Sequence, residues 1–329
     1  MTALLLSHDC YTQFGDALKV KIQALGSPLN LLPLPQNKDA RLNVEELNSV
    51  KVAFFSQDLF PHHSRQFFSS VRQARALEWL HVFNVGVDHP IYSELLQRGV
   101  RITTSAGTTA EPIAQTALAG LLMLSRGFPR WLKAQTEHRW APQRLQDSPR
   151  DLSGQTVLIY GLGSIGRHFA RFAKTLGLKV IGVQRRARQP DDLVDEIHPP
   201  TALDALLPRA QWLLVSCPLT SETQKLFNAE RLARLPRGAY VLNVARGEVF
   251  DEAALTEALR EGHLGGAYLD VFEVEPLPTD SALWDLPNVI ITPHNATTAL
   301  GNQQRVLDCF LSHLQQWHQG QPLSNEVFL

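Results

Sequence analysis

A glycine-rich turn, Gly161-Leu162-Gly163-Ser164-Ile165-Gly166, constrains the fold of this chain more than any other feature. An apolar run at 156–160 precedes it, and a helical pattern over 165–176 follows it. A second apolar run, 179–183, comes directly after that pattern. Strand, glycine turn, helix and strand in this order predict a βαβ unit with two parallel strands. The turn alone would be a weak signal, but here each flanking element is in place.

The glycines of the turn have separate roles in a βαβ unit of this kind. Gly161 allows the tight turn, Gly163 lets the backbone approach a pyrophosphate, and Gly166 lets the helix pack closely on the strand. Ser164 and Ile165 open the helix, whose N-terminal N–H groups favour a phosphate. We therefore predict that Gly161, Gly163, Ser164, Ile165 and Gly166 contact a dinucleotide. The alternative is a glycine turn without a ligand.

The residues that end the second strand indicate which dinucleotide is bound. An acidic residue about 20 positions beyond the first glycine is typical of NAD sites, where it binds the ribose 2′-hydroxyl. This chain has Gln184, Arg185 and Arg186 there, with Arg188 close behind. Guanidinium groups suit a 2′-phosphate, so we predict a preference for NADP(H), with NAD(H) as the alternative. A solvated basic turn is the simplest other interpretation of these arginines.

Alternating strand-like and helix-like patterns extend over the rest of the chain. Runs at 50–55, 77–83 and 100–103 predict strands, and 91–98 predicts a helix. The apolar start of the chain, residues 1–7, is expected to be a first strand rather than a signal peptide, because it lacks a basic segment and a cleavage site. Alternation of this kind is typical of α/β folds with a parallel sheet.

A chain of 329 residues suits two domains. We expect an α/β protein in which a doubly wound parallel sheet (Rossmann) forms a nucleotide-binding domain, residues 104–294. It is inserted in a smaller flavodoxin-like α/β domain, residues 1–103 plus 295–329, which binds the substrate. The helical pattern over 302–319 is expected to pack beside the first domain.

Two segments near the predicted domain boundary indicate an interface. Residues 111–124 form a helical pattern that is apolar almost all round, so we expect it to be buried between domains or subunits. A polar stretch with several charges, 137–151, follows and is expected to be a loop. It contains Trp140, which we interpret as an anchor of the loop in a dimer contact.

Composition excludes several classes of protein. The net charge is −1, from 31 basic and 32 acidic residues, so no global field favours nucleic acid or an anionic membrane. No apolar run approaches the ~18 residues of a membrane-spanning helix. The three cysteines show no paired spacing, which indicates free thiols in a reducing compartment. We expect a cytoplasmic protein without a metal site and without nucleic-acid or membrane partners.

Three polar motifs follow three successive predicted strands of the second domain. They are Asn243-Val244-Ala245-Arg246-Gly247, Asp270-Val271-Phe272-Glu273-Val274-Glu275-Pro276 and Thr292-Pro293-His294-Asn295-Ala296. Taken singly, each has an ordinary structural explanation: a surface arginine, a solvated acidic turn, a capping histidine. Ligands of open α/β sheets bind at the carboxyl ends of the strands, so we expect the three motifs to converge on one site.

As an ordered set, these motifs resemble those of the D-isomer-specific 2-hydroxyacid dehydrogenases. The resemblance extends over nearly the whole chain, includes Asn84-Val85-Gly86-Val87-Asp88 and Cys217-Pro218-Leu219-Thr220, and is nearest to NADP-using glyoxylate and hydroxypyruvate reductases. It implies that Arg246 orients the substrate, that His294 is the proton donor and acceptor, and that Glu275 is the acid paired with His294. Glu273, by the same comparison, is expected to be a surface residue.

The resemblance also implies further contacts. Val85 and Gly86 would bind the substrate carboxylate through their N–H groups, and Trp140 would lie near the active site of a homodimer partner. Asp270 would hold the nicotinamide carboxamide. The remaining expected cofactor contacts are Cys217, Pro218, Thr223, Val244 and Ala245. One departure is Gln115, where the family often has Glu, and it affects no catalytic group.

The resemblance implies an oxidoreductase that reduces small 2-keto acids, such as glyoxylate or hydroxypyruvate, to D-2-hydroxy acids by hydride transfer from NAD(P)H. A formate-type enzyme is disfavoured because such enzymes pair the histidine with Gln, and here the residue is Glu275. A phosphoglycerate dehydrogenase remains an alternative, although no further regulatory domain is expected within 329 residues. A nucleotide-sensing corepressor on the same scaffold is another, disfavoured by the absence of long disordered tails.

Overall fold

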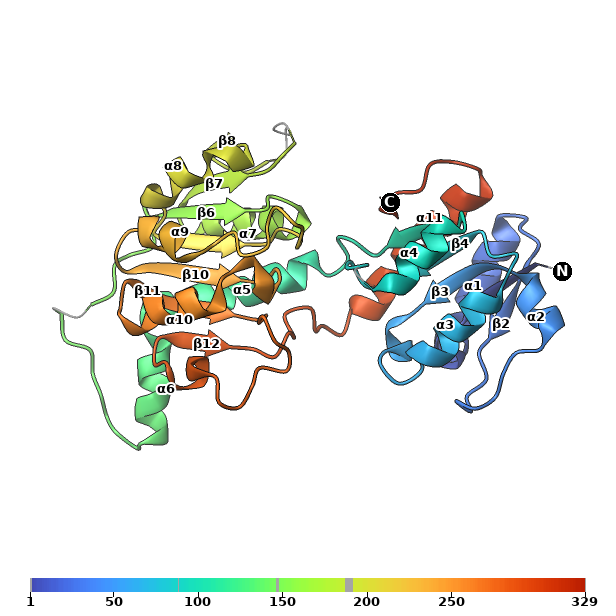
Figure 1. Cartoon of the computed structure of the whole chain (residues 1–329), viewed down its shortest axis with the longest axis horizontal. Coiled ribbons are helices and arrows are strands. Elements are labelled where there is room, and N and C mark those ends of the chain that lie inside the picture. Colours follow the sequence, from blue (N-terminus) through green and yellow to red (C-terminus); the bar gives the residue numbers. More distant parts are fainter. Residues whose placement is uncertain (1, 88, 146–147, 187–191, 329) are drawn as a thin grey trace. The chain divides into compact units, whose positions relative to one another are not determined.

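The computed structural model describes residues 2–87, 89–145, 148–186 and 192–328, which divide into two compact units (Figure 1). Unit 1 consists of residues 1–109 and 299–329, and unit 2 of residues 110–298. The units thus end at residues 109 and 298, a few residues beyond the predicted 103 and 294. That unit 1 binds the substrate stays a prediction.

Unit 1 is built on one sheet with the strand order β2-β1-β3-β4-β5-β13. Its strands are β1 (Thr2–Leu6), β2 (Leu29–Pro33), β3 (Val50–Phe55), β4 (Trp79–Val82), β5 (Arg101–Thr104) and β13 (Glu326–Val327). The first five are parallel, and β13 pairs antiparallel with β5. The order 2-1-3-4-5 is that of flavodoxin-like folds, as predicted.

Helices cover both faces of this sheet. They are α1 (His8–Ala24), α2 (Val44–Ser49), α3 (Ser64–Gln73), α4 (Pro90–Gln97), α11 (Asn302–His318) and the short 3-10 turn η1 (Gln57–Leu59). Apolar side chains of α2, α3 and α4 share one core with the sheet, and those of α1 and α11 share the other. The C-terminal helix α11 therefore belongs to the first unit, as its apolar spacing predicted.

Unit 2 is built on a second sheet with the strand order β8-β7-β6-β9-β10-β11-β12. Its strands are β6 (Thr156–Tyr160), β7 (Lys179–Val183), β8 (Glu196–His198), β9 (Trp212–Val215), β10 (Ala239–Asn243), β11 (Leu264–Leu269) and β12 (Val289–Ile291). All neighbouring strands are parallel. Numbered from β6, the order begins 3-2-1-4-5-6, which defines the Rossmann fold. The predicted fold class is confirmed.

The helices of unit 2 also lie on both faces. They are α5 (Ala110–Arg126), α6 (Phe128–Thr136), α7 (Ser164–Thr175), α8 (Leu203–Leu206), α9 (Ala229–Arg234) and α10 (Glu252–Arg260). The described residues of the unit also contain the 3-10 turns η3 (Pro200–Ala202), η4 (Leu207–Arg209), η5 (Gly247–Val249) and η6 (Ala282–Asp285). The cores on the two faces contain side chains of α8, α9 and α10 on one side and of α5 and α7 on the other. Of these helices, the sequence patterns predict only α5 and α7 by residue range.

Helix α5 was expected to be buried between domains or subunits. Its apolar side chains Ile113, Ala117 and Leu121 are buried in the core of unit 2 itself, against α7 and the sheet. The approach is close, since a Cβ on Gly120 would lie 2.4 Å from the ring of Tyr268. The opposite face is exposed and carries polar residues together with Leu122. One face of the helix is therefore buried within unit 2 itself, and burial of the other face against a partner subunit stays a prediction.

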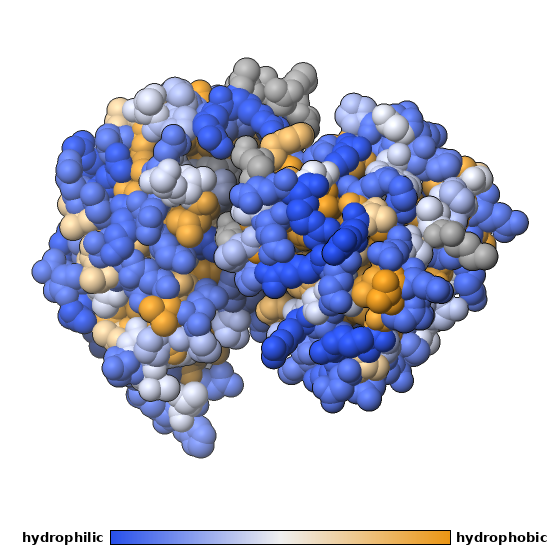
Figure 2. Space-filling model, turned by 45° about the vertical axis from the view of Figure 1, so that its right-hand side comes forward, coloured by the Kyte–Doolittle hydropathy of each residue, from blue (hydrophilic) through white to orange (hydrophobic). Residues whose placement is uncertain are grey.

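The outer surface is mostly polar. On the face that Figure 2 shows, hydrophilic side chains predominate, and apolar ones form small separate patches. Within the described residues, no helix combines the length and the apolar character that crossing a bilayer requires. The cytoplasmic location stays a prediction.

Candidate active site

The turn between β6 and α7 explains each glycine of the motif. Gly161 has a φ of +99°, and a Cβ there would lie 2.5 Å from the backbone nitrogen of Cys217. A Cβ on Gly166 would lie 2.5 Å from the carbonyl oxygen of Gly161. Beside Gly163, no heavy atom lies within 4 Å of the position that a Cβ would take. Two glycines thus allow close packing, and the third leaves open space.

That open space fits a phosphate group. Helix α7 begins at Ser164, and its N-cap residue Gly163 provides no side-chain hydrogen bond. The first N–H groups of a helix have no partner within the helix and carry partial positive charge. Backbone donors beside a glycine without neighbours form a cradle of the kind that binds the pyrophosphate of a dinucleotide.

The loop after β9 lies beside this turn, at the point where the strand order reverses. The Ser216 hydroxyl donates to the carbonyl oxygen of Gly161 at 2.8 Å. Cys217 is buried, and burial raises the pKa of its thiol to about 12. The Thr223 hydroxyl donates to the Pro218 carbonyl oxygen at 2.8 Å, which holds the loop closed. The predicted contacts Cys217, Pro218 and Thr223 therefore belong to one ordered loop at the switch point.

The tip of β7 has the predicted arginines, but it also has a carboxylate nearby that was not predicted. Arg185 and Arg186 are exposed there, as predicted, whereas Arg188 lies outside the described residues. A carboxylate does come close, because Asp192 is buried and accepts a hydrogen bond from Arg167 Nε at 2.6 Å. Arg167 also donates to the side chain of Gln184 at 3.3 Å. The acid is therefore paired with a guanidinium from α7, a contact that the spacing along the chain did not show.

The loop after β10 is fixed by Asn243. Its side chain is buried, accepts from the Ala245 N–H at 3.1 Å and donates to the Arg246 carbonyl oxygen at 3.1 Å. The Arg246 guanidinium donates to the Ala245 carbonyl oxygen at 2.7 Å and is partly exposed. Val244 and Ala245 are buried. The sequence signal for this role was present, since Asn243 is a polar residue at the end of an apolar strand.

Gly247 brings the Arg246 loop against the next strand end. A Cβ on Gly247 would lie 1.8 Å from the backbone carbon of Phe272, so no other residue fits without moving one of the two loops. The first two predicted motifs, after β10 and after β11, are therefore in backbone contact.

Asp270 ties the second motif to the third. Its carboxylate is buried and accepts from the Thr292 hydroxyl at 2.6 Å and from the Asn295 N–H at 2.9 Å. It also accepts from the Ala296 N–H, at 3.1 Å to Oδ2. Thus Asp270 orders the loop that carries His294, a role that the sequence did not show. Its predicted contact to the nicotinamide stays a prediction.

Glu275 and His294 meet at these loops. His294 Nδ1 lies 2.7 Å from Glu275 Oε2, and Glu275 Oε1 accepts from the Phe272 N–H at 3.1 Å. His294 has a φ of +53°, in the left-handed region that non-glycine residues seldom adopt, and its N–H donates to the Asp270 carbonyl oxygen at 2.8 Å. Backbone strain of this sort is typical of functional sites. The two side chains are 36% and 43% exposed, so the pair is open to a ligand.

Glu273 differs from its expected place on the surface. Its side chain is only 28% exposed and lies 3.4 Å from the ammonium of Lys225, while its N–H donates to Glu252 at 2.9 Å. Burial, followed by the charge of Glu273, raises the pKa of Glu252. The two acids of the motif thus have different partners: Glu273 lies beside Lys225, and Glu275 is hydrogen-bonded to the imidazole of His294.

The other predicted substrate contacts, Val85 and Gly86 in unit 1 and Trp140 in unit 2, lie outside the helices and strands. In unit 1, Val85 is 51% exposed, and the side chain of Asn84 donates to the Gly86 carbonyl oxygen, which tightens this turn. Asp88 of the same motif lies outside the described residues. In unit 2, Trp140 is 94% exposed. Both interpretations of Trp140, a loop anchor in the dimer contact and a residue near the partner's active site, stay predictions.

Fold and site together define the class of two-unit α/β dehydrogenases that use a nicotinamide dinucleotide. Residues 118–296 match the model of the D-isomer specific 2-hydroxyacid dehydrogenase NAD-binding domain. The chain belongs to this family of NAD(P)-dependent D-2-hydroxyacid dehydrogenases.

Individual relatives are similar over most of the chain. A glyoxylate reductase from Thermofilum pendens is 33% identical over 236 residues, 70% of this chain and 69% of that protein. A D-isomer specific 2-hydroxyacid dehydrogenase family protein from Aeromonas salmonicida has a TM-score of 0.80 at 32% identity, over 99% of both chains. A D-isomer specific 2-hydroxyacid dehydrogenase from Xanthobacter autotrophicus, solved with NADPH and MES, has a TM-score of 0.77 at 32% identity, over 99% and 98% of the chains.

Proposed function

We propose that this enzyme reduces glyoxylate, hydroxypyruvate or a similarly small 2-keto acid to the D-2-hydroxy acid. The observation that carries the proposal is the Glu275–His294 pair, with Nδ1 and Oε2 at 2.7 Å, on loops in contact with that of Arg246. A bound nicotinamide supplies the hydride. The similarity to a glyoxylate reductase supports the choice of a small keto acid.

The chain's own residues divide the remaining work. Because Glu275 accepts from Nδ1, the ring presents Nε2 to the substrate, and this nitrogen donates a proton to the oxygen that becomes the hydroxyl. Arg246 binds the substrate carboxylate and stabilises the charge that develops on the keto oxygen. Val85 and Gly86 are the proposed N–H donors to the carboxylate.

We propose that NADP(H) is preferred over NAD(H). Two exposed guanidinium groups, of Arg185 and Arg186, stand at the tip of β7. The nearby acid Asp192 is paired with Arg167, which reduces its repulsion of a phosphate. The relative from Xanthobacter autotrophicus was solved with NADPH. The proposed cofactor contacts are those predicted from the sequence at the glycine turn, the β7 tip, the 217–223 loop, Val244, Ala245 and Asp270.

We further propose that two chains form a homodimer through unit 2. Apolar side chains of α5, α6 and the following loop are exposed, among them Leu122, Phe128, Leu132 and Trp140. A groove of 520 Å³ beside them is lined by apolar residues and by charged side chains of α6 and the loop after it. The apolar residues are Met123, Pro129, Leu132, Leu286, Pro287 and, on the edge strand β12, Val289 and Ile290. Exposed apolar surface next to an unpaired strand edge is typical of an interface.

A steady-state survey tests the activity. Glyoxylate, hydroxypyruvate, pyruvate and a bulky branched 2-keto acid are each assayed with NADPH and with NADH. The proposal predicts the highest kcat/KM for one of the first two acids with NADPH. A higher kcat/KM for the branched acid would reject the assignment of a small substrate while leaving the family unchanged.

A further inference from the structure

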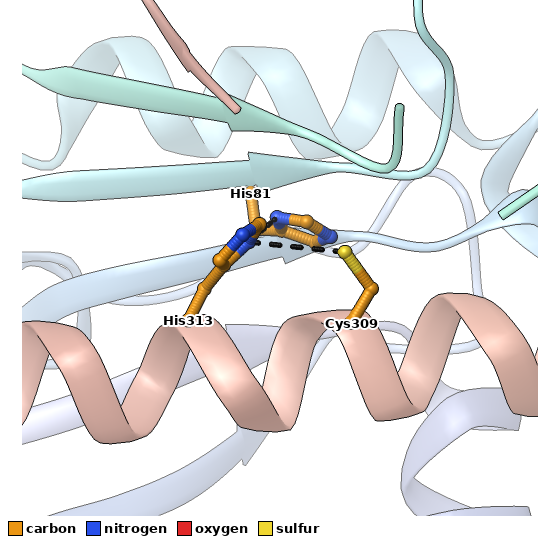
Figure 3. Close-up of side chains that lie close together, drawn as sticks. All are labelled: His81, Cys309 and His313. Carbon is orange, nitrogen blue, oxygen red and sulfur yellow. Dashed lines mark hydrogen bonds between the residues drawn. The ribbon is translucent and has the colours of Figure 1, made fainter. Parts of the chain in front are cut away.

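Two histidines and a cysteine from distant parts of the chain meet inside unit 1. His81 extends from β4, whereas Cys309 and His313 lie four residues apart on the same face of α11 (Figure 3). The Nδ1 atoms of the two imidazoles are 3.4 Å apart, and the Cys309 sulfur lies 3.9 Å from His313 Nδ1. One ligand atom of each residue lies within 4.8 Å of the other two. These three side chains take no part in the proposed reaction.

Neighbouring hydrogen bonds orient His81. The Ser105 hydroxyl donates to the Val82 carbonyl oxygen at 3.1 Å, so its oxygen accepts from His81 Nε2 at 3.0 Å. We assign the proton of His81 to Nε2 on this basis, which leaves the lone pair on Nδ1, the nitrogen nearest His313 Nδ1. Metal-binding histidines are held in this way, with the second ring nitrogen donating to a fixed acceptor.

Thr103 completes the surroundings of His81 Nδ1. Its hydroxyl lies 2.8 Å from that nitrogen, and its oxygen accepts from the Trp79 indole at 2.9 Å. The indole fixes the oxygen, but the hydroxyl proton can rotate. An ion at His81 Nδ1 would take the place of the hydrogen bond to Thr103, and the Thr103 oxygen would have to move away from that nitrogen.

Two of the spacings between the ligand atoms are close to those that a small cation requires. With metal–nitrogen and metal–sulfur bonds of about 2.0 and 2.3 Å, tetrahedral angles place two nitrogens about 3.3 Å apart and nitrogen and sulfur about 3.5 Å apart. The corresponding distances here are 3.4 and 3.9 Å. Cys309 is partly exposed, whereas both histidines are buried, so an ion can enter from the cysteine side.

We propose that His81, Cys309 and His313 form a binding site for a transition-metal cation of the borderline class, with Zn²⁺ as its reference. Two imidazole nitrogens and one thiolate hold the ion, and water completes the four positions that Zn²⁺ prefers. Cys309 loses its thiol proton to solvent on binding, and the metal undergoes no change in oxidation state. The ion links β4 to α11 and so stabilises the attachment of the C-terminal helix.

The full-length protein, freed of metal by a chelator and dialysis, is titrated with Zn²⁺ and separately with Co²⁺. We expect one tight equivalent per chain, and with Co²⁺ the charge-transfer absorption of a thiolate ligand. Cys309→Ser should lose that absorption and at least ~100-fold in affinity, more than is usual for a residue that only supports a ligand. Cys10→Ser alters the other cysteine of unit 1, so it is the control and should behave like the wild type.

Two further measurements do not depend on how well Cys309→Ser folds. In the wild type, Zn²⁺ should protect Cys309 from alkylation, detected by peptide mass spectrometry. Ser105→Ala, which removes the acceptor of His81 Nε2, should weaken Zn²⁺ binding by ~10-fold. Unprotected Cys309, binding that survives Cys309→Ser, or no tight equivalent would each overturn the proposal, and the cluster would then be a hydrogen-bonded part of the core. Keto-acid turnover tests the proposed function and is measured separately from metal binding.

Discussion

Arg246 stands at the end of β10, held by Asn243 on one side and by the Gly247 contact on the other. A planar fork is needed to bind a carboxylate and to meet the keto oxygen, so lysine is a poor substitute. Arg246→Lys should lower kcat/KM for keto-acid reduction by at least ~100-fold, the usual loss of a charge-stabilising donor. Steady-state assays with NADPH measure kcat/KM for the variant and the wild type. Kinetics near those of the wild type would remove Arg246 from the proposed role.

The two acids of the second motif provide a matched pair. Glu275→Gln replaces the acceptor of the His294 imidazole with a neutral group and should lower kcat by ~10²–10⁴-fold, the range typical of acid–base groups. Glu273→Gln alters a residue that lies beside Lys225 and Glu252, so activity should stay within a factor of a few. Equal losses in the two variants would contradict the assignment of Glu275.

The buried imidazoles of unit 1 predict a pH dependence of stability. Burial, and then the neighbouring His313, lowers the pKa of His81, and burial lowers that of His313. In the unfolded chain, histidine pKa values are about 6.5. Just below that pH, these two histidines are therefore protonated in the unfolded chain but remain neutral in the folded chain. The free energy of unfolding should therefore be fully retained above pH ~6.5 and fall as the pH drops below it.

Chemical denaturation at several pH values, with a chelator present, measures this slope. His81 is faced by Thr103 of β5, by Ser105 directly after β5, and by Cys309 and His313 of α11, none of which is acidic. His313→Gln removes one titrating group, so the fall should be shallower than in the wild type. His62→Gln, at an exposed position, is the control and should leave the slope unchanged. An identical slope in both variants would show that the buried pair is not its source.

At the scale of elements, the tip of β7 decides the cofactor. A 2′-phosphate carries nearly two charges at neutral pH, and Arg185 and Arg186 are exposed beside the expected ribose site. NADPH should exceed NADH in kcat/KM by at least ~10-fold at low salt, about 1.4 kcal/mol. The gap should shrink as salt rises, because exposed charges are screened.

The double variant Arg185→Ala, Arg186→Ala should lose most of this preference while keeping its rate with NADH. Equal or better use of NADH by the wild type would show that the arginines form only a solvated turn. Arg167 of helix α7 should also affect the choice of cofactor, because its guanidinium pairs with Asp192 near the tip of β7. Arg167→Ala would free that acid, so it should also reduce the use of NADPH.

At the scale of the whole molecule, the exposed apolar surface on α5, α6 and the Trp140 loop predicts association. Light scattering of the wild type should give the mass of a twofold dimer. Leu132→Glu places a charge among these side chains and should shift the mass toward the monomer at low concentration. Val44→Glu, at an exposed apolar position of unit 1, is the control. A monomeric wild type over a wide concentration range would refute the dimer.

The sequence by itself determined the fold class, because local patterns are short-range and strong. The βαβ unit around Gly161 requires only neighbours within thirty residues, and apolar runs set the strands of both sheets. The glycine requirements at 161 and 166 and the separate treatment of Glu275 and Glu273 followed from residue type and motif. Helix α6, like α1, α3 and α10, was not predicted by its residue range. For α5, amphipathicity shows that a face is buried but not against what.

Tertiary structure decided the contacts between residues distant in the chain. Asp270 orders the His294 loop, Gly247 touches Phe272, Arg167 pairs with Asp192, and His81 meets Cys309 and His313 across more than 200 positions. No spacing along the chain encodes these meetings, since each depends on which strands become neighbours and on how deeply a helix packs. The sequence thus determined which chemical groups the protein has, and the packing of its sheets and helices determined which of them meet.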